Sequence, residues 1–255
     1  MGIITEIAQP NRTALRSTSS APSTPTANDA SMLRLLQLSS ATLPVGGYAF
    51  SHGLEWALEA EWLSTSDDVI EWLSVQLTES VATLDLPILH RQCLALEQQD
   101  IPALIQWNDT VLACRESYEL RLTDTALADA MIRLLHGLSI ETDLLNTLDN
   151  QSKKPHNISY VTTFAIAATH WRISPHYAAL GYAWAWLENQ VAAATKLTLF
   201  GQLSAQKAID ALMPVVEQAV NQSLLISDDD IGTSLPGLAM ASSHHETQYS
   251  RLFRS

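Results

Sequence analysis

The chain has 255 residues, of which 47% are hydrophobic and only 16% charged, and its formal net charge is −13. Nucleic acids and anionic membranes are bound through clustered lysine and arginine, so 14 such residues spread among 27 acidic ones argue against both as partners. The hydrophobic fraction predicts a sizeable core, with some apolar surface left for protein partners to cover.

The two ends of the chain differ in composition from its middle. Residues 1–30 are rich in serine, threonine, proline and alanine, as in STSSAPSTPTANDA, and bury too little apolar surface to offset the entropy of ordering. We therefore expect a disordered extension over 1–30, a helical domain over 31–225 and a tail over 226–255. No uninterrupted apolar run reaches the ~18 residues of a membrane span, and no basic start precedes an apolar block, so we expect a cytoplasmic protein.

Apolar residues recur every three or four positions along most of 31–225, which predicts a single all-α domain of about eight to ten helices. Helix start signals precede the runs over 69–84, 102–121 and 175–197: Ser64 with Asp67 and Asp68, Asp100 with Pro102, and Ser174 with Pro175. Further helices are expected over 125–135, over 160–171 and from residue 204. A new helix or a kink is expected at Pro87, and a polar loop over 146–157.

Arg115, Glu116 and Glu119 crowd the C-terminal part of the run over 102–121. Arg115 and Glu119 are four residues apart, so they fit an ordinary solvated ion pair on one helix face. The other interpretation is that these charges contact a partner.

The stretch LPVGGYAFSHGLE over 43–55 organises the chain, because it places Pro44 and the pair Gly46-Gly47 directly before a helical run. We expect a rigid, exposed corner in which both glycines take conformations closed to β-branched residues, with Tyr48 beside them and Glu55 near a partner surface. A plain helix–turn–helix corner is the alternative. The glycines form no phosphate loop, because no Gly-Lys-Ser/Thr follows.

No metalloprotease, EF-hand, nucleophile-elbow or dinucleotide motif occurs. His244-His245 lies in a tail without fixed geometry, so we interpret it as polar tail rather than as a metal site. For His52, at the corner, a structural hydrogen bond competes with a functional role. Cys93 and Cys114 lack CxxC spacing and are predicted to be free thiols.

The tail after Asp228 combines turn-forming residues with a few apolar anchors and lacks a helical period. Such a segment is typical of one that orders on binding, so we expect it to be mobile in the free protein and to dock on a partner. The alternative is permanent packing on the helical body. The expected anchors are Tyr249, Leu252 and Phe253, with Arg251 and Arg254 pairing with carboxylates of the partner.

Four segments carry a resemblance to a known family: LPVGGYAFSHGLEWALEA over 43–60, CRESYELR over 114–121, AWAWLENQVAAATKL over 183–197 followed by Gly201-Gln202, and HETQYSRLFRS over 245–255. In this order and spacing, the chain resembles the UreF family of urease accessory proteins from residue 31 to the C-terminus. It departs from the family in Phe200, where proline-leucine is frequent, and in the extension over 1–30.

The resemblance implies an all-helical, cytoplasmic homodimer without catalytic activity or a cofactor. UreF-like proteins bridge the accessory protein UreD, also called UreH, and the nickel-carrying GTPase UreG, and the assembly delivers nickel to apo-urease. The alternative is a helical metal-binding chaperone or enzyme whose site is built from scattered histidine, glutamate and aspartate. Lys196 and Gln202 are expected to contact the GTPase, and the tail to contact UreD. The full set of expected partner-binding residues is Gly46, Gly47, Tyr48, His52, Glu55, Arg115, Glu116, Glu119, Lys196, Gln202, Tyr249, Arg251, Leu252, Phe253 and Arg254.

Overall fold

The computed structural model describes residues 27–140, 157–232 and 234–254. Within these ranges the chain is all-α and has no strand, as the sequence predicts. The α-helices are α1 (Ala27–Leu38), α2 (Leu54–Glu59), α3 (Ser66–Gln76), α4 (Leu86–Gln98), α5 (Ile101–Ala113), α6 (Tyr118–Gly137), α8 (Tyr160–His170), α9 (Pro175–Lys196), α10 (Gln202–Ser223) and α11 (Pro236–His245). Segments η1 (Gly47–Ala49) and η3 (Asp228–Asp230) are 3-10 helical, and η2 (Leu77–Asp85) is π-helical. None of the described helices is long and apolar enough to cross a membrane.

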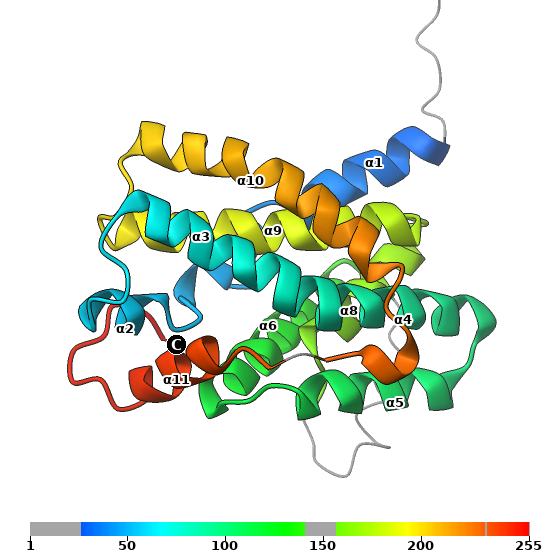
Figure 1. Ribbon diagram of the computed structural model, residues 1–255. Helices are drawn as coiled ribbons and strands as arrows, with labels where there is room; N and C mark the ends of the chain where they lie inside the picture. The colour runs from blue at the N-terminus through cyan, green and yellow to red at the C-terminus, as the bar shows by residue number, and fades with distance from the viewer. Residues whose placement is uncertain (1–26, 141–156, 233, 255) are drawn as a thin grey trace, which may run out of the picture.

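Helix α9 runs through the middle of the molecule and is enclosed by other helices (Figure 1). It packs against α10, α4, α8 and α1, and it also contacts η1 at the corner. Its small residues permit this crowding. A Cβ on Gly181 would lie 2.5 Å from atoms of both Leu35 and Ser39, so only glycine lets α1 approach so closely.

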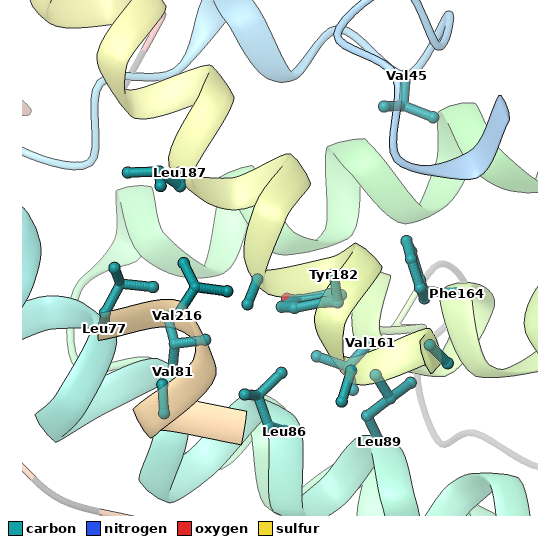
Figure 2. Close-up of a cluster of buried hydrophobic side chains, with 14 of the residues drawn as sticks. Val45, Leu77, Val81, Leu86, Leu89, Val161, Phe164, Tyr182, Leu187 and Val216 are labelled. Carbon is teal, nitrogen blue, oxygen red and sulfur yellow. The ribbon is translucent and has the colours of Figure 1, made fainter. Parts of the chain in front are cut away.

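Long apolar side chains from five elements form the core beside α9. Figure 2 shows them converging from η2, α4, α8, α9 and α10: Leu77, Val81, Leu86, Leu89, Val161, Phe164, Tyr182, Leu187 and Val216. All are buried. Since full burial of one such aliphatic or aromatic side chain contributes about 1.5–3 kcal/mol, this cluster is the main source of stability for the central helix.

Residues 66–98 form one helical run in which α3, η2 and α4 follow without a break. The run begins with a capping box, in which the Thr65 hydroxyl accepts from the Asp68 N–H and the Asp68 carboxylate accepts from the Thr65 N–H. The change expected at Pro87 is a return from π-helical to α-helical backbone at Leu86. Pro87 has no N–H to donate to the Thr83 carbonyl four residues earlier, and that carbonyl accepts from the Gly232 N–H at 3.0 Å instead. π-Helical segments concentrate at functional sites, and η2 ends at Asp85, part of the site described below.

The prediction of one helix over 102–121 is wrong in its second half. Helix α5 starts at Asp100, whose side chain accepts from the Ala103 N–H, but it ends at Ala113. Ser117 then caps α6 by accepting from the Leu120 N–H. Because the chain turns at 114–117, Arg115 and Glu119 do not share a helix face, and the predicted ion pair between them is not formed.

Two other predictions concern the extension at the start of the chain and the loop over 146–157. The extension predicted over 1–30 overlaps α1, which begins at Ala27, so disorder to residue 30 is wrong for its last four residues. Residues 1–26 and most of the loop predicted over 146–157 lie outside the described residues. The starts predicted at Pro175 for α9 and near Ser204 for α10 are confirmed to within two residues.

Candidate functional site

The corner over 43–55 is tight, as predicted, and its two glycines serve different purposes. Gly46 has φ +81° with open space around it, so its backbone conformation is what disfavours a side chain. Gly47 does not have a positive φ, so the restricted backbone conformation predicted for both glycines is found only at Gly46. At Gly47 the constraint is space, because a Cβ there would lie 2.8 Å from the Asn189 Nδ2 of α9. Tyr48, between them and α2, is exposed. The corner is therefore held against α9 while Tyr48 points to solvent.

His52 lies inward of this corner and packs edge-on against the Trp186 ring, with 6.4 Å between centroids. Burial, reinforced by the positive charge of Arg115, lowers the pKa of His52 to about 4. The imidazole is therefore neutral near pH 7, and it serves as a wall of the cavity described below.

Glu55 differs from its prediction, because it is buried and contacts the chain's own tail. Its carboxylate accepts hydrogen bonds from the Leu252 N–H at 2.6 Å and the Phe253 N–H at 2.9 Å, and it lies 3.0 Å from His245 Nε2. The residue is 7% exposed. Its place in the first turn of α2 favours a negative charge there, because helix N-termini carry a partial positive charge.

Glu119, in the first turn of α6, receives the tail from the other side. It is 3% exposed, and its carboxylate lies 2.8 Å from His245 Nδ1 and accepts a hydrogen bond from Arg251 at 2.9 Å. His245 itself is 0% exposed. The imidazole is thus held between two buried carboxylates that come from distant parts of the chain.

The last residues of the chain continue along the corner. The Phe253 ring is buried under Lys196, whose Nζ lies 4.2 Å from the ring centroid and also donates to the Leu252 carbonyl at 3.3 Å. The Arg254 N–H donates to the Ala49 carbonyl of η1 at 2.9 Å. The end of the tail is therefore fixed to the corner and to the C-terminal end of α9, beside α2 (Figure 1).

The expectation of a mobile, non-helical tail is therefore corrected by the structure, in which residues 236–245 form α11 and the segment after it is packed. Helix α11 contacts α2 and α6, and the Ser242 and Ser117 hydroxyls share a hydrogen bond of 2.7 Å. The sequence of α11, PGLAMASSHH, does not predict a helix, because the helix packs through small residues and has no apolar stripe. The backbone of α11 also approaches Gly53 closely, since a Cβ on Gly53 would lie 2.9 Å from the Ser242 nitrogen.

A second buried cluster is centred on Arg115, in the turn between α5 and α6. Its guanidinium forms ion pairs with Asp85 at the end of η2 and with Asp124 of α6, the latter at 2.6 Å. Asp124 also accepts from the Tyr160 N–H at 2.5 Å, and the Tyr182 hydroxyl donates to Asp85 at 3.3 Å. Burial alone would lower the Arg115 pKa, but the two carboxylates raise it well above its usual value. The positive charge of Arg115 therefore pairs with carboxylates of the same chain.

A cavity of about 90 Å³ lies between this cluster and the corner. Its polar lining includes His52, Arg115, Glu116 and Gln190, and Trp186 forms part of its apolar wall. The Gln190 Oε1 atom is buried and has no hydrogen-bond partner among the described residues. A space of this size and polarity is large enough for water, which would satisfy that amide.

Comparison with known proteins identifies the family. A sequence model of the UreF family matches residues 63–213. The chain belongs to the UreF family. A protein of Marinomonas sp. (strain MWYL1) named urease accessory protein UreF is 49% identical over 228 residues, which are 89% of this chain and 95% of that relative. Proteins with the same name from Alkalilimnicola ehrlichii and Chromohalobacter salexigens are 43% and 42% identical, each over 87% of this chain and over 95% and 93% of their own length.

The structure of this UreF-family chain separates the predicted partner-binding residues into two groups. The first group faces inward or is packed: Gly46, Gly47, His52, Glu55, Arg115, Glu119 and Phe253. The second group is exposed to solvent: Tyr48, Glu116, Lys196, Gln202, Tyr249, Arg251, Leu252 and Arg254. Glu116 accepts from the Ser234 hydroxyl at 2.6 Å. Gln202 is the exposed first residue of α10, and Tyr249 is fully exposed between α11 and the docked end of the tail. Lys196 contacts Leu252, and Arg254 is hydrogen-bonded to Ala49, the residue after Tyr48, so these exposed residues belong to the segments that meet where the tail joins the corner.

Sequence reasoning missed four residues that build the two buried clusters, Asp85, Asp124, Tyr182 and His245, and also missed Gln190 of the cavity. Asp85 and Asp124 occupy apolar helical runs at positions that face the core, which is a signal of a buried ion pair. The pairing of His245 with Glu55, 190 residues earlier, leaves no local signal in the sequence. Among the described residues, no group of three or more histidine, cysteine, aspartate or glutamate side chains is placed to hold a metal ion.

Proposed function

We propose that this UreF-family protein is a non-catalytic scaffold of urease maturation, which bridges UreD (UreH) and the GTPase UreG while nickel is inserted into apo-urease. The relatives are named urease accessory proteins, which supports a role in maturation rather than in urea hydrolysis itself. The bridging role and the identity of the partners are our proposal.

The observation that carries this proposal is the surface formed where the tail meets the corner. Its members are the exposed residues Tyr48, Lys196, Leu252 and Arg254, and we call it the corner surface. Backbone hydrogen bonds from Phe253 and Arg254 hold it in place, so its side chains are presented without a large ordering cost. Tyrosine and arginine are enriched in protein interfaces, so Tyr48 and Arg254 beside an exposed leucine favour a protein-binding surface.

We propose that UreD binds the tail side of the corner surface and that UreG contacts the side formed by Lys196 and Gln202. The two sides adjoin, because Lys196 contacts both Leu252 and Phe253 of the tail. A scaffold that holds two partners side by side in this way requires no catalytic group of its own. In this arrangement, loss of the docked tail would weaken both contacts.

The proposal is tested by capture of the cognate UreD and UreG on the purified full-length protein. Leu252 is 53% exposed, so Leu252→Asp should leave the fold intact and reduce capture of UreD by at least about tenfold, as expected for an interface hot spot. Leu225→Asp is the matched control, because Leu225 is 85% exposed and comes just after α10, whose C-terminal end lies far from the C-terminus of the chain (Figure 1). Full capture of UreD by the Leu252→Asp protein, with circular dichroism unchanged, would contradict the proposal.

We also propose that the protein is a cytoplasmic homodimer. Exposed apolar side chains outside the corner surface support an additional covered face, and α1 alone exposes Met32, Leu33 and Leu36. Light scattering of the purified protein measures the oligomeric state directly. A single species with the mass of one chain at micromolar concentration would refute the dimer.

A further inference from the structure

The buried cluster of His245, Glu55 and Glu119 contains more hydrogen-bond acceptors than a neutral histidine can satisfy. His245 presents Nδ1 to Glu119 at 2.8 Å and Nε2 to Glu55 at 3.0 Å. A neutral imidazole has one N–H donor and one acceptor nitrogen, so one of these two contacts would set a lone pair against a carboxylate oxygen. Both contacts are hydrogen bonds only if the group of three side chains holds one additional proton.

The position of that proton follows from the other contacts of the two carboxylates. Glu55 also accepts the backbone N–H groups of Leu252 and Phe253, and Glu119 also accepts the guanidinium of Arg251. Donors of this kind favour the ionised carboxylate. The proton therefore resides on His245, which becomes an imidazolium that donates to both sides.

The charges that face His245 balance only in this state. Helix α2 contributes Glu55, helix α6 contributes Glu119, and the tail contributes Arg251. With His245 protonated, two buried anions meet two cations, whereas a neutral imidazole leaves one negative charge uncompensated in a buried site. Charged groups at the margin are more exposed: Glu59 near Gln248, Glu246 beside the Glu119 N–H, and Lys196 over Phe253.

We propose that docking of the C-terminal segment 246–254 is linked to uptake of one proton by His245, which makes the segment a pH-sensitive latch on Glu55 and Glu119. The same two glutamates that hold the imidazole also hold the tail, Glu55 through the N–H groups of residues 252 and 253 and Glu119 through Arg251. Loss of the proton therefore weakens the attachment of the whole segment. This inference concerns the protein alone and does not depend on which partners it binds.

The sign of the pH dependence follows from linkage. Burial lowers the pKa of His245, but its hydrogen bonds to Glu119 and Glu55 outweigh burial, so the pKa is raised above 6.5. A group whose pKa is raised in the docked state stabilises docking fully below its undocked pKa and loses that effect as pH rises through the docked pKa. The latch is therefore fully closed below about pH 6.5 and opens as the pH rises through the raised pKa of His245.

Amide hydrogen exchange of the full-length protein tests the latch, because the Leu252 and Phe253 N–H groups are protected only when the tail is docked. After correction for the intrinsic exchange rate, protection should fall as the pH rises above about 6.5, in total by about tenfold for each pKa unit that docking adds. In His245→Gln, protection should be lower and no longer vary with pH. In His244→Gln, the matched control whose ring stacks on Trp56 at 4.6 Å, the pH dependence should remain.

A direct measurement covers the case in which His245→Gln does not fold. In a ¹H–¹⁵N spectrum of the wild-type imidazoles at a pH just below 6.5, both ring nitrogens of His245 should have the shift of an imidazolium. A neutral His245 with the tail docked would overturn the proposal. Wild-type protection that does not change with pH, or a pH dependence that persists in His245→Gln, would overturn it as well.

Discussion

Replacing Arg115 by methionine tests whether the cluster around it holds the helices together. The substitution removes the cation that pairs with Asp85 and Asp124, whose side chains are 5% and 3% exposed. Breaking a buried ion pair by removing one partner costs about 3–5 kcal/mol, because the remaining charge is left uncompensated. Methionine preserves much of the aliphatic volume, so we expect a loss of about 3 kcal/mol in the free energy of unfolding, due mainly to charge.

The assay is urea unfolding followed by circular dichroism at 222 nm, with wild type and variant compared under the same conditions. Asp228→Asn is the control, because it breaks the ion pair between Asp228 and Arg91, and the Asp228 side chain is 69% exposed. Exposed pairs contribute about 0–1 kcal/mol, so this control should lose less than about 1 kcal/mol.

The pH dependence of the Arg115→Met protein separates charge from packing. Burial raises the pKa of Asp85, and Arg115 opposes that shift in the wild type. Without Arg115, the pKa of Asp85 in the folded protein rises further. Asp85 then contributes stability that is fully present below its pKa in the unfolded chain and is lost as the pH rises through its pKa in the folded protein. The deficit relative to wild type should therefore be smaller near pH 4.5 than near pH 7. A loss below about 1 kcal/mol, or a deficit that is equal at both pH values, would refute the reasoning.

Four further outcomes are expected. Gly47→Val should lower the free energy of unfolding by about 1–3 kcal/mol in urea melts through overlap with Asn189, and Asn189→Ala in the same chain should recover part of the loss; no loss in the single variant would contradict this. Phe253→Ala should raise the exchange rate of the tail amides and cost up to about 3 kcal/mol; unchanged exchange would show that the ring does not anchor the tail. His52, with its pKa lowered to about 4, contributes stability that is present above pH 6.5 and lost as pH falls toward 4, so His52→Gln should flatten the wild-type loss over that window, and identical pH profiles would count against it. Purified protein should carry much less than one nickel per chain by mass spectrometry, and a stoichiometric content would favour the metal-chaperone alternative.

The sequence predicted the elements of this fold well wherever local chemistry determines them. The start signals at Asp68, Asp100 and Pro175 mark real helix starts, because such signals involve residues only a few positions apart. The cap before α3 is Thr65 rather than the predicted Ser64. The error at 114–117 has a local cause too. Ser117 is a good N-cap, but the apolar period continues across it, so the break between α5 and α6 was not recognised.

The candidate site was predicted only in part, because its contacts join residues far apart in the chain. Glu55 and Glu119 belong to recognisable motifs, yet their common partner His245 follows them by 190 and 126 residues. Periodicity reports burial of apolar faces and gives no signal for a short helix that packs through serine and alanine. For the same reason α11 was predicted as an irregular, mobile segment.

The two buried clusters differ in how their charge is balanced, and this difference has a physical consequence. Arg115 remains charged at any accessible pH, so its pairing with Asp85 and Asp124 is permanent and fixes α6, η2 and α9 relative to one another. The cluster of Glu55 and Glu119 instead depends on His245, whose charge can change near neutral pH. A permanent cation therefore lies where the helical body must not move. A titratable one lies where the tail attaches, which is the part of the molecule that a partner would have to engage or displace.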